Sequence, residues 1–320
     1  REEVITKIKN CIQEILYNND YEYELDYYGS YVTKLNIESS DIDILIKFKC
    51  FSINNNTNNH IDNIIALLDK NFNLNKKNCN IKQINAIYTA SVPVLKIECD
   101  LSNIIPNEIK EKLCKNYLFN LEKEIYKLNF DFTFLEYFDD FKNLSAPSQE
   151  IIPFIQNSIL SFPQIKPIIL IIKRYMQINK LNSSFNGGIS STSIFLLVFA
   201  FYKYHLINYF SKINSIGKNL FDFFTFYNNF NFGISIIDVQ NDFPFLFTEL
   251  HSGMILLDPI TRYNVSKSTI KVDEIKSAFT KAIIVINNAI NMMNMDKDID
   301  ISFLEELFRS KNSDKLGSII

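Results

Sequence analysis

The stretch that decides the fold is residues 27–46, YYGSYVTKLNIESSDIDILI. It begins as a strand, turns at Gly29 and Ser30 into a short helix, and ends in a strand whose apolar residues alternate with polar ones. Because side chains on a strand alternate between its faces, Asp41 and Asp43 are expected on one face, with the intervening isoleucines toward the core. The sequence therefore predicts two carboxylates on the polar face of a half-buried strand, close to a glycine turn.

This arrangement indicates phosphate chemistry. Two carboxylates at this spacing can hold divalent cations, which prefer oxygen ligands, and a pair of such ions can hold the attacking and leaving oxygens of a phosphoryl transfer. The N–H groups of the helix that opens at Gly29, together with the hydroxyl of Ser30, suit the phosphates of a nucleotide. The plain alternative is an acidic strand end facing solvent beside an unrelated turn. The combined motif and context favour a site for two Mg²⁺ or Mn²⁺ ions and a nucleoside triphosphate.

The pattern resembles the polymerase β-type nucleotidyltransferases, whose signature is Gly-Ser, a helix, and Asp-hydrophobic-Asp. It resembles most closely the noncanonical poly(A) polymerases and terminal uridylyltransferases, and the resemblance extends over nearly the whole chain. Other similar segments are 92–96 (VPVLK), 170–174 (LIIKR), 181–182 (LN), 187–191 (GGISS), 257–259 (LDP), 264–267 (NVSK) and 275–279 (IKSAF). The resemblance implies an α+β fold, with a polymerase β-like nucleotidyltransferase domain built on a mixed sheet, a mostly helical poly(A)-polymerase-associated central domain, and a cleft between them.

A change of character near residue 140 predicts two domains, in agreement with a length of 320 residues at roughly 150 residues per domain. With the resemblance, 21–140 is expected to be the catalytic palm domain. Residues 1–20 and 141–320 are expected to form the helical domain with its nucleotide-recognition segment. Apolar spacing predicts helices over 3–17, 61–72, 108–126, 150–161, 165–180, 190–210, 220–227 and 273–293, and strands from 21 to the Gly-Ser turn and over 41–48, 91–101 and 128–134.

A third carboxylate has two candidates. Asp131 opposes three phenylalanines in 129–134 (NFDFTF), and Asp100 opposes an apolar face in 95–100 (LKIECD). Periodicity alone does not choose between them. In the family the third Asp lies on the strand after the Val-Pro strand and its hairpin, so the resemblance selects Asp131 as metal ligand and leaves Asp100 as a polar turn residue. The helical stretch that replaces the short hairpin is a departure from the family pattern.

The resemblance also implies contacts to the triphosphate from the helical domain. Lys173 stands among isoleucines, where a lysine otherwise snorkels to the surface, and would offset phosphate charge. Gln177 stands four residues later, on the same face, where many relatives carry a second lysine, and could still donate a hydrogen bond. Ser190 and Ser191 would donate hydroxyls to phosphate, or act as ordinary helix caps.

The base would be read in the segment 258–267, through Asp258 and Asn264. The plain alternative for these residues is a Pro-containing turn with an Asn suited to its backbone. Thr192 stands where relatives usually carry Tyr or Phe for base stacking, so stacking is expected to weaken or to come from Tyr263. Uridylyltransferases of the family tend to carry a His just before the Asn, and this segment has none. The loop therefore favours ATP over UTP.

Net charge and cysteine content limit which partners and which cellular compartment are expected. Lys and Arg total 33 against 36 Asp and Glu, which gives a net charge of −3, whereas proteins that grip long nucleic acid carry a positive excess. RNA contact is therefore expected to be local or supplied by an RNA-binding partner protein. The five cysteines form no Cys-x-x-Cys pair, which predicts reduced thiols in an intracellular compartment; nuclear relatives favour the nucleus over the cytoplasm.

No membrane partner is expected, because the longest apolar runs, 167–172 and 194–202, fall short of the roughly 20 residues that span a bilayer. The resemblance implies a template-independent enzyme that transfers AMP from ATP to the 3′ end of RNA. A terminal uridylyltransferase using UTP is the alternative. A third hypothesis, motivated by Thr192 and Gln177, is a catalytically silent nucleotidyltransferase fold that serves as a protein-binding scaffold.

Overall fold

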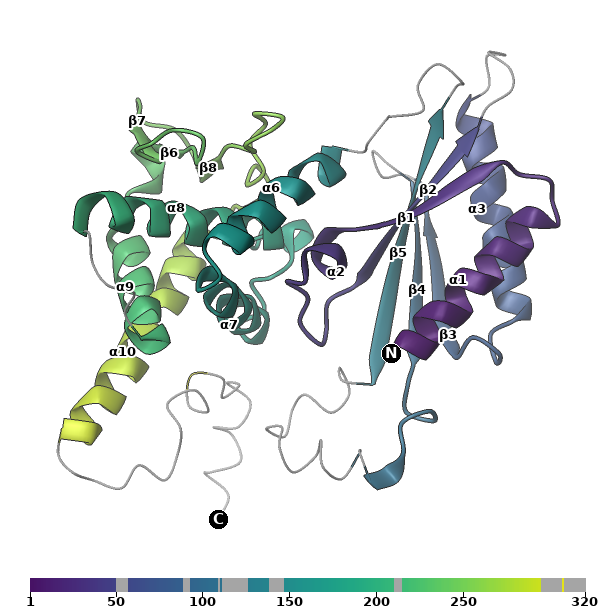
Figure 1. Cartoon of the computed structure of the whole chain (residues 1–320), viewed down its shortest axis with the longest axis horizontal. Helices are drawn as coiled ribbons and strands as arrows, with labels where there is room; N and C mark the ends of the chain where they lie inside the picture. The colour runs from purple at the N-terminus through teal and green to yellow at the C-terminus, as the bar shows by residue number, and fades with distance from the viewer. Residues whose placement is uncertain are drawn as a thin grey trace. The chain divides into compact units, whose positions relative to one another are not determined.

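The computed structural model describes residues 1–49, 57–88, 93–108, 110, 126–137, 147–209, 215–294 and 307. The chain divides into two compact units, Arg1–Ile152 and Pro153–Ile320, whose elements are labelled in Figure 1. The catalytic and helical domain limits expected from the sequence, and the cleft between those domains, stay predictions. The helix expected over 108–126 lies mostly outside the described residues.

The first unit is built on a five-stranded mixed sheet with the order β1-β2-β5-β4-β3. The strands are β1 (Tyr23–Tyr28), β2 (Ile42–Lys49), β3 (Ile81–Ile87), β4 (Val94–Asp100) and β5 (Lys127–Tyr137). The central strands β2 and β5 run parallel, and each of the other neighbouring pairs runs antiparallel. In β2 and β5 buried apolar residues alternate with partly exposed polar ones. This alternation gives the sheet one apolar and one polar face.

Helices α1 (Glu2–Tyr17) and α3 (Thr57–Leu74) provide the partner for the apolar face, and both lie alongside the sheet in Figure 1. α1 buries residues three and four apart, among them Ile5, Ile8 and Ile12, in one core with the isoleucines of β2 and the phenylalanines of β5. Each fully buried side chain of this size contributes roughly 1.5–3 kcal/mol. The sequence grouped 1–20 with the helical domain, whereas the apolar stripe of α1 packs with the sheet.

The second unit is mostly helical. Its helices are α6 (Pro147–Ser161), in which the unit boundary falls, α7 (Ile165–Ile178), α8 (Ser191–Tyr209), α9 (Ile216–Asn229) and α10 (Val272–Asn294). Two buried tyrosines join these helices through their hydroxyl groups. Tyr175 Oη donates to the carbonyl oxygen of Ala278 at 2.7 Å, and Tyr227 Oη donates to the carbonyl oxygen of Leu197 at 2.7 Å. These bonds satisfy polar atoms that burial would otherwise leave unpaired.

A small sheet completes the second unit. Strands β6 (Ser235–Ile237), β7 (Phe245–Phe247) and β8 (Ile255–Leu256) pair in the order β7-β6-β8. The sequence predicted neither this sheet nor β3. Two or three residues are too few to show a period, and β3 is an edge strand with mostly exposed or partly exposed side chains. Among the described residues, no helix is both long enough and apolar enough to cross a bilayer.

Candidate active site

A row of polar residues crosses the polar face of the five-stranded sheet. Backbone register aligns, in order across β1, β2, β5, β4 and β3, the residues Tyr28, Asp43, Asp131, Lys96 and Asn85. Residues directly opposite in register share a face, and the flanking residues of β2 and β5 belong to the core on the other side. The structure therefore brings together Asp43 and Asp131, two residues that are more than 80 positions apart in the sequence. We call these five residues the polar row.

Asp41 lies just before β2 and joins this group. Asn129 Nδ2 donates a hydrogen bond to Asp41 Oδ1 at 3.0 Å. Burial, and then the negative charge of Asp131, raise the pKa of Asp41, while the hydrogen bond from Asn129 and the positive charge of Lys96 oppose that shift. The two carboxyl groups are thus near enough to repel each other. Sequence reasoning assigned no role to Asn129, because its contact depends on the pairing of β2 with β5.

The turn before β2 presses against Asp43. Gly29 has φ +65°, and a Cβ at this position would lie 2.3 Å from Asp43 Oδ2. Glycine is therefore required both by the backbone conformation and by the nearby carboxylate. Gly29 and Ser30 open the five-residue helix α2 (Gly29–Thr33), so the short helix expected between the two strands is present.

Tyr28 closes one side of the row. Its hydroxyl lies 3.2 Å from Thr133 Oγ1 on β5, so the ring of Tyr28 reaches from β1 across β2. Burial raises the pKa of Tyr28 to about 12, with smaller contributions from the negative charges of Asp43 and Asp131. Tyr28 is therefore a neutral hydrogen-bonding group at neutral pH, next to two of the carboxylates.

Lys96, on β4, lies next to Asp131 on the side away from Asp43. Its Nζ forms a close ion pair with Asp131 Oδ2. Among the described residues, no three His, Cys, Asp or Glu side chains are arranged so that they could hold a metal ion. The carboxylate oxygens of Asp41, Asp43 and Asp131 are nevertheless the donor type that Mg²⁺ and Mn²⁺ prefer. The donor set fits a divalent cation, and the side chain of Asp131 is engaged by Lys96 instead.

Asp100, the other candidate for the third carboxylate, lies elsewhere on β4. It is paired in register with Lys127, at the start of β5, four residues from the polar row. Its Oδ1 accepts a hydrogen bond from the backbone N–H of Ser102 at 2.8 Å. Hydrogen bonds from Ser102 lower the pKa of Asp100. This geometry is that of a turn residue.

Helix α7 carries Lys173 and Gln177, two of the residues expected to contact the triphosphate. Lys173 is only 5% exposed, so its side chain does not snorkel to the surface. Arg174 Nη1 donates a hydrogen bond to Gln177 Oε1 at 2.6 Å. A guanidinium group, which sequence reasoning missed, therefore stands beside the glutamine. The spacing of three residues on one helix was the available signal.

The start of α8 shows capping geometry. Ser190 Oγ accepts a hydrogen bond from the backbone N–H of Ser193 at 3.0 Å and lies 2.8 Å from Ser193 Oγ. Ser191 is exposed and Thr192 is partly exposed. Ser190 thus performs the capping role that the sequence allowed as the alternative, and phosphate contacts from these residues stay a prediction.

The segment 258–267, which we call the recognition loop, is shaped by Asp258. This residue is 5% exposed, and its Oδ1 accepts hydrogen bonds from the backbone N–H groups of Ile260 at 2.8 Å and Thr261 at 2.9 Å. Such bonds define a tight turn around Pro259. In the structure, the carboxylate of Asp258 therefore serves the loop's own backbone.

Asn264 also acts on nearby backbone. Its Oδ1 accepts hydrogen bonds from the backbone N–H groups of Leu256 at 3.1 Å and Ser266 at 3.0 Å, and its Nδ2 donates to the carbonyl oxygen of Met254 at 3.2 Å. Tyr263, by contrast, is 76% exposed. Base reading by Asp258, Asn264 and Tyr263 stays a prediction.

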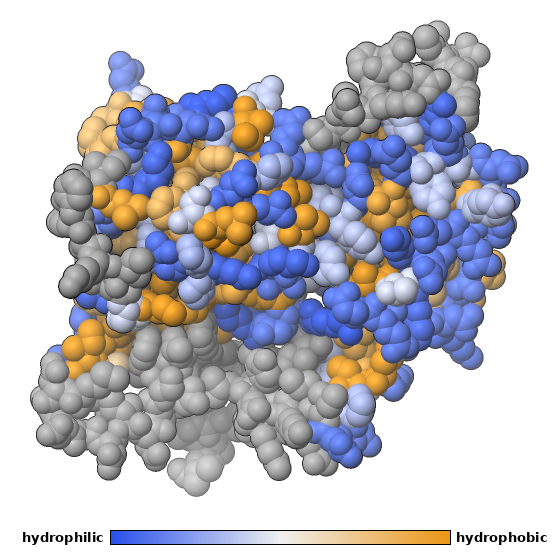
Figure 2. Space-filling model, viewed as in Figure 1, coloured by the Kyte–Doolittle hydropathy of each residue, from blue (hydrophilic) through white to orange (hydrophobic). Residues whose placement is uncertain are grey.

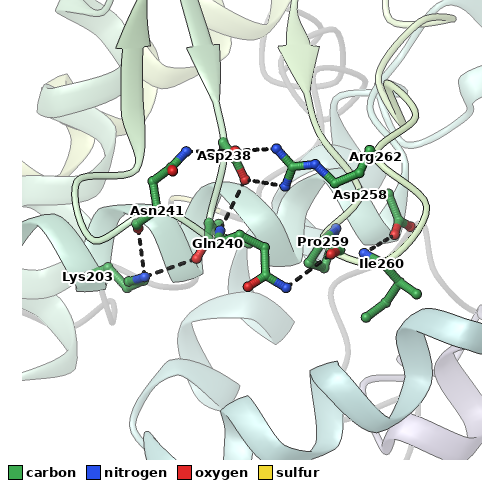
Figure 3. Close-up of polar contacts among 9 residues, drawn as sticks. Lys203, Asp238, Gln240, Asn241, Asp258, Pro259, Ile260 and Arg262 are labelled. Carbon is green, nitrogen blue, oxygen red and sulfur yellow. Dashed lines mark hydrogen bonds and ion pairs between the residues drawn. The ribbon is translucent and has the colours of Figure 1, made fainter.

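A buried carboxylate outside the loop holds it in place (Figure 3). Asp238 follows β6, its side chain is 3% exposed, and both of its oxygens bind the guanidinium group of Arg262. Asp238 also accepts hydrogen bonds from the backbone N–H of Gln240 at 3.1 Å and from Asn241 Nδ2 at 2.7 Å. Arg262 has φ +63°, a strained conformation for a residue with a side chain. No local pattern marked Asp238, because its partner is 24 residues away.

Comparison with known proteins shows which family this chain is similar to. Residues 1–113 match the family model described as "Poly(A) RNA polymerase, mitochondrial-like, central palm domain". Poly(A) RNA polymerase protein 1 of Eremothecium gossypii is 22% identical over 305 residues, which is 90% of this chain and 41% of that protein. The chain is similar to noncanonical poly(A) polymerases. The family resemblance stated from the sequence is confirmed.

One of the proteins similar to this chain is named as inactive. An inactive noncanonical poly(A) RNA polymerase protein of Drosophila melanogaster is 23% identical over 220 residues, covering 67% of this chain and 44% of that protein. The chain spans less than half the length of both of these curated relatives.

Solved structures establish the fold. The polymerase core of TRAMP, an RNA surveillance complex, aligns with a TM-score of 0.66 at 18% identity, over 97% of this chain and 87% of that one. A mutant of the Cid1 poly(U) polymerase bound to MgATP aligns with a TM-score of 0.63 at 16% identity, over 97% of this chain and 92% of that one. The expected α+β, polymerase β-like nucleotidyltransferase fold is therefore confirmed.

Proposed function

We propose that this chain is a template-independent nucleotidyltransferase that adds AMP from ATP to the 3′ end of RNA. The observation that carries the proposal is the register of β2 with β5, which sets Asp43 opposite Asp131 with Asp41 on the same face. In the reaction, the 3′-hydroxyl loses its proton, its oxygen bonds to the α-phosphorus of ATP, and the bond to the β-phosphate breaks to release pyrophosphate. Single-step transfer of this kind requires positioning and charge stabilisation more than covalent catalysis.

Asp41 and two aspartates of the polar row are proposed to divide this work. Asp41 and Asp43 would hold both divalent cations, and Asp131 would orient the 3′-hydroxyl and help remove its proton. Bound Mg²⁺ or Mn²⁺ supplies positive charge to the attacking and leaving oxygens. Gly29 leaves room beside the Asp43 carboxylate that a side chain would fill. The position of Asp100 at a turn, away from Asp43, supports Asp131 as the third carboxylate.

The triphosphate contacts are proposed from Ser30 in α2 and from residues of the second half of the chain. Ser30 and Lys173 would bind the phosphates, with Ser190 and Ser191 as further hydroxyl donors. Gln177 adds no charge, but the guanidinium group of Arg174 bonded to it does. ATP is favoured over UTP because the recognition loop has no histidine before Asn264. The net charge of −3 supports an RNA-binding partner protein, and a nuclear location is proposed with it.

Primer extension tests the proposal. The protein is incubated with an end-labelled RNA primer and each nucleoside triphosphate in turn, with Mg²⁺ or Mn²⁺. Long tails with ATP alone are expected. A preference for UTP would instead support a uridylyltransferase. No extension under any condition would support a silent scaffold, and one relative of the chain is an inactive noncanonical poly(A) RNA polymerase protein.

Substitution of Asp131 and of Asp100 in the same assay tests which of them is the third carboxylate. Asp131→Ala and Asp100→Ala remove the same group from neighbouring strands of one sheet. Loss of at least about 100-fold in rate is expected for Asp131→Ala, as for Asp41→Ala and Asp43→Ala, because transition-state charge would lose its support. Asp100→Ala is expected to retain activity close to that of the unmodified chain. The opposite ranking would move the third carboxylate to Asp100.

A further inference from the structure

The ion pair between Lys96 and Asp131 is a feature of the polar row that a metal site does not require. Lys96 is directly opposite Asp131 in the pairing of β4 with β5, and its side chain is 44% exposed, against 20% for Asp131. The positive charge of Lys96 is also felt at Asp41. This lysine is therefore a cation held among the carboxylates from which the metal ligands are drawn.

The rest of β4 shows that this pairing is selective. Glu98, two residues further along the same face, is paired with Lys82 at 2.9 Å and with Lys127 at 3.5 Å. Two lysines thus neutralise Glu98, and Lys96 is directed to Asp131 alone in the ion pairs of the described residues. The Lys96–Asp131 pair lies within the polar row, and the pairs of Glu98 lie outside it on the same sheet.

A lysine in this position competes with a divalent cation. An ammonium group and a metal ion both seek the carboxylate oxygens of Asp131, and two positive charges within about 5 Å repel each other appreciably even in water. Among the described residues the three aspartates do not close around a metal ion, and Asp131 is the one engaged by a cation of the chain itself.

We propose that Lys96 is an internal counter-ion of Asp131, which a divalent cation must displace before the three carboxylates can close around it. The inference rests on the proposed function, because it takes Asp131 to be a metal ligand. Lys96 acts through Asp131 and is a positioning residue. It neutralises the carboxylates while no cation is bound, and it makes metal binding weaker than the carboxylates alone would allow.

The test measures Mn²⁺ binding directly, without activity. Electron paramagnetic resonance of free Mn²⁺ gives the dissociation constant for the whole chain in the absence of nucleotide. Lys96→Met is expected to bind Mn²⁺ more tightly, by on the order of tenfold at low ionic strength. The gain is expected to shrink at about 1 M salt, where the screening length falls to about 3 Å. Lys96→Arg keeps the positive charge and is expected to bind Mn²⁺ like the unmodified chain.

Lys82→Met is the matched control, because it removes a lysine that pairs with a carboxylate of the same strand outside the polar row. It is expected to leave the Mn²⁺ affinity unchanged. Thermal unfolding without metal verifies that each variant is folded. If Lys96→Met binds Mn²⁺ no more tightly than Lys82→Met does, the counter-ion role is overturned.

Failure of the proposed metal site has a different signature. The double variant Asp41→Asn, Asp43→Asn is expected to lose Mn²⁺ binding. If it binds Mn²⁺ as the unmodified chain does, the metal site itself is misplaced and the proposed function loses its basis. If it loses Mn²⁺ while Lys96→Met shows no gain, the metal site stands and only the role of Lys96 is wrong.

Discussion

Adding one methyl group at Gly29 is expected to disturb the site while the chain still folds. Gly29→Ala would place a Cβ 2.3 Å from Asp43 Oδ2, so the carboxylate must move. We expect at least about a tenfold loss of primer extension, because even small displacements of positioned groups have large effects on rate. The strain of alanine at φ +65° is expected to lower the free energy of unfolding by about 1–2 kcal/mol.

Gly253→Ala separates these two effects. Gly253 has φ +79°, but a Cβ there meets nothing nearer than the carbonyl oxygen of Thr269 at 4.0 Å. Its stability loss, measured by urea unfolding, is expected to match that of Gly29→Ala, with activity retained. Equal activity losses in both variants would assign the effect to backbone strain and not to Asp43.

Asp41 is expected to destabilise the metal-free protein at neutral pH. Its pKa is raised chiefly by burial, so the folded state binds more protons than the unfolded state between the two pKa values, and stability falls as pH rises through that window. Asp41→Asn removes this penalty. Thermal unfolding without metal is expected to show a higher Tm for the variant at pH 7 and no difference below about pH 4, although the variant loses activity.

Asp100 is expected to show the opposite sign. Hydrogen bonds from Ser102 lower its pKa, so Asp100 contributes stability that is present above its unfolded pKa and is lost as pH falls through the lower, folded value. Asp100→Asn is therefore expected to lower the Tm at pH 7, and the difference is expected to vanish in acid. A higher Tm for Asp100→Asn, or a lower one for Asp41→Asn, would contradict these environments.

The alternation of side chains along a strand predicts part of the candidate site. A period of two places Asp41 and Asp43 on one face of a strand without any structure. It assigns Asp131 and Asp100 to a polar face equally well, and so does not choose between them. That choice, and the contact of Lys96 with Asp131, depends on which strands are neighbours and in what register, which non-local pairing decides.

Elements with a buried stripe or face were predictable to within a few residues. The expected helix 3–17 is α1, the expected strand 41–48 is β2, and the expected helix 273–293 is α10. Each has a long or regular apolar pattern, which is the strongest local signal. β3 lacks that pattern, because an edge strand with an exposed face needs few apolar residues. The sheet β7-β6-β8 is defined by pairing across the chain more than by its own sequence.

The pair Asp238 and Arg262 gives an element-scale prediction for the recognition loop. Asp238→Asn removes the charge from a buried group with several hydrogen-bond partners, and Arg262 at its exposed end is half in solvent. We expect the free energy of unfolding to fall by about 1–3 kcal/mol and the Michaelis constant for ATP to rise. The pKa of Asp238 is lowered chiefly by Arg262, so the stability difference is expected to disappear in acid.

Asp222→Asn is the control for this loop. Asp222 pairs with Lys218 at 2.9 Å on the surface of α9, four residues apart. Exposed pairs of this kind are worth about 0.3–0.5 kcal/mol, so a small change in urea unfolding and no change in the Michaelis constant are expected. If Asp238→Asn behaves like Asp222→Asn in both measurements, the buried pair does not shape the loop.

On the scale of the whole molecule, charge limits how the chain can hold RNA. Hydrophilic residues and smaller hydrophobic patches are mixed over the face seen in Figure 2, and the net charge is −3. Many lysines of the described residues are engaged by the chain's own carboxylates. These pairs include Lys7–Glu3, Lys47–Asp26, Lys49–Glu22, Lys82–Glu98, Lys96–Asp131, Lys127–Glu98, Lys218–Asp222 and Lys271–Glu274. Because carboxylates outnumber lysines and arginines in the whole chain, 36 to 33, it has no positive excess with which to neutralise RNA phosphates.

The salt dependence of RNA binding measures this directly. Each phosphate neutralised on a single strand contributes about −0.7 to the slope of log K against log salt concentration. We expect fluorescence anisotropy with a labelled oligo(A) primer to give a slope of about −2 or shallower, equivalent to about three phosphates or fewer. A basic RNA-binding domain measured in the same buffers is the control for the method. A slope of about −5 or steeper would mean that the chain grips the backbone by itself, and the charge argument for an RNA-binding partner would be lost.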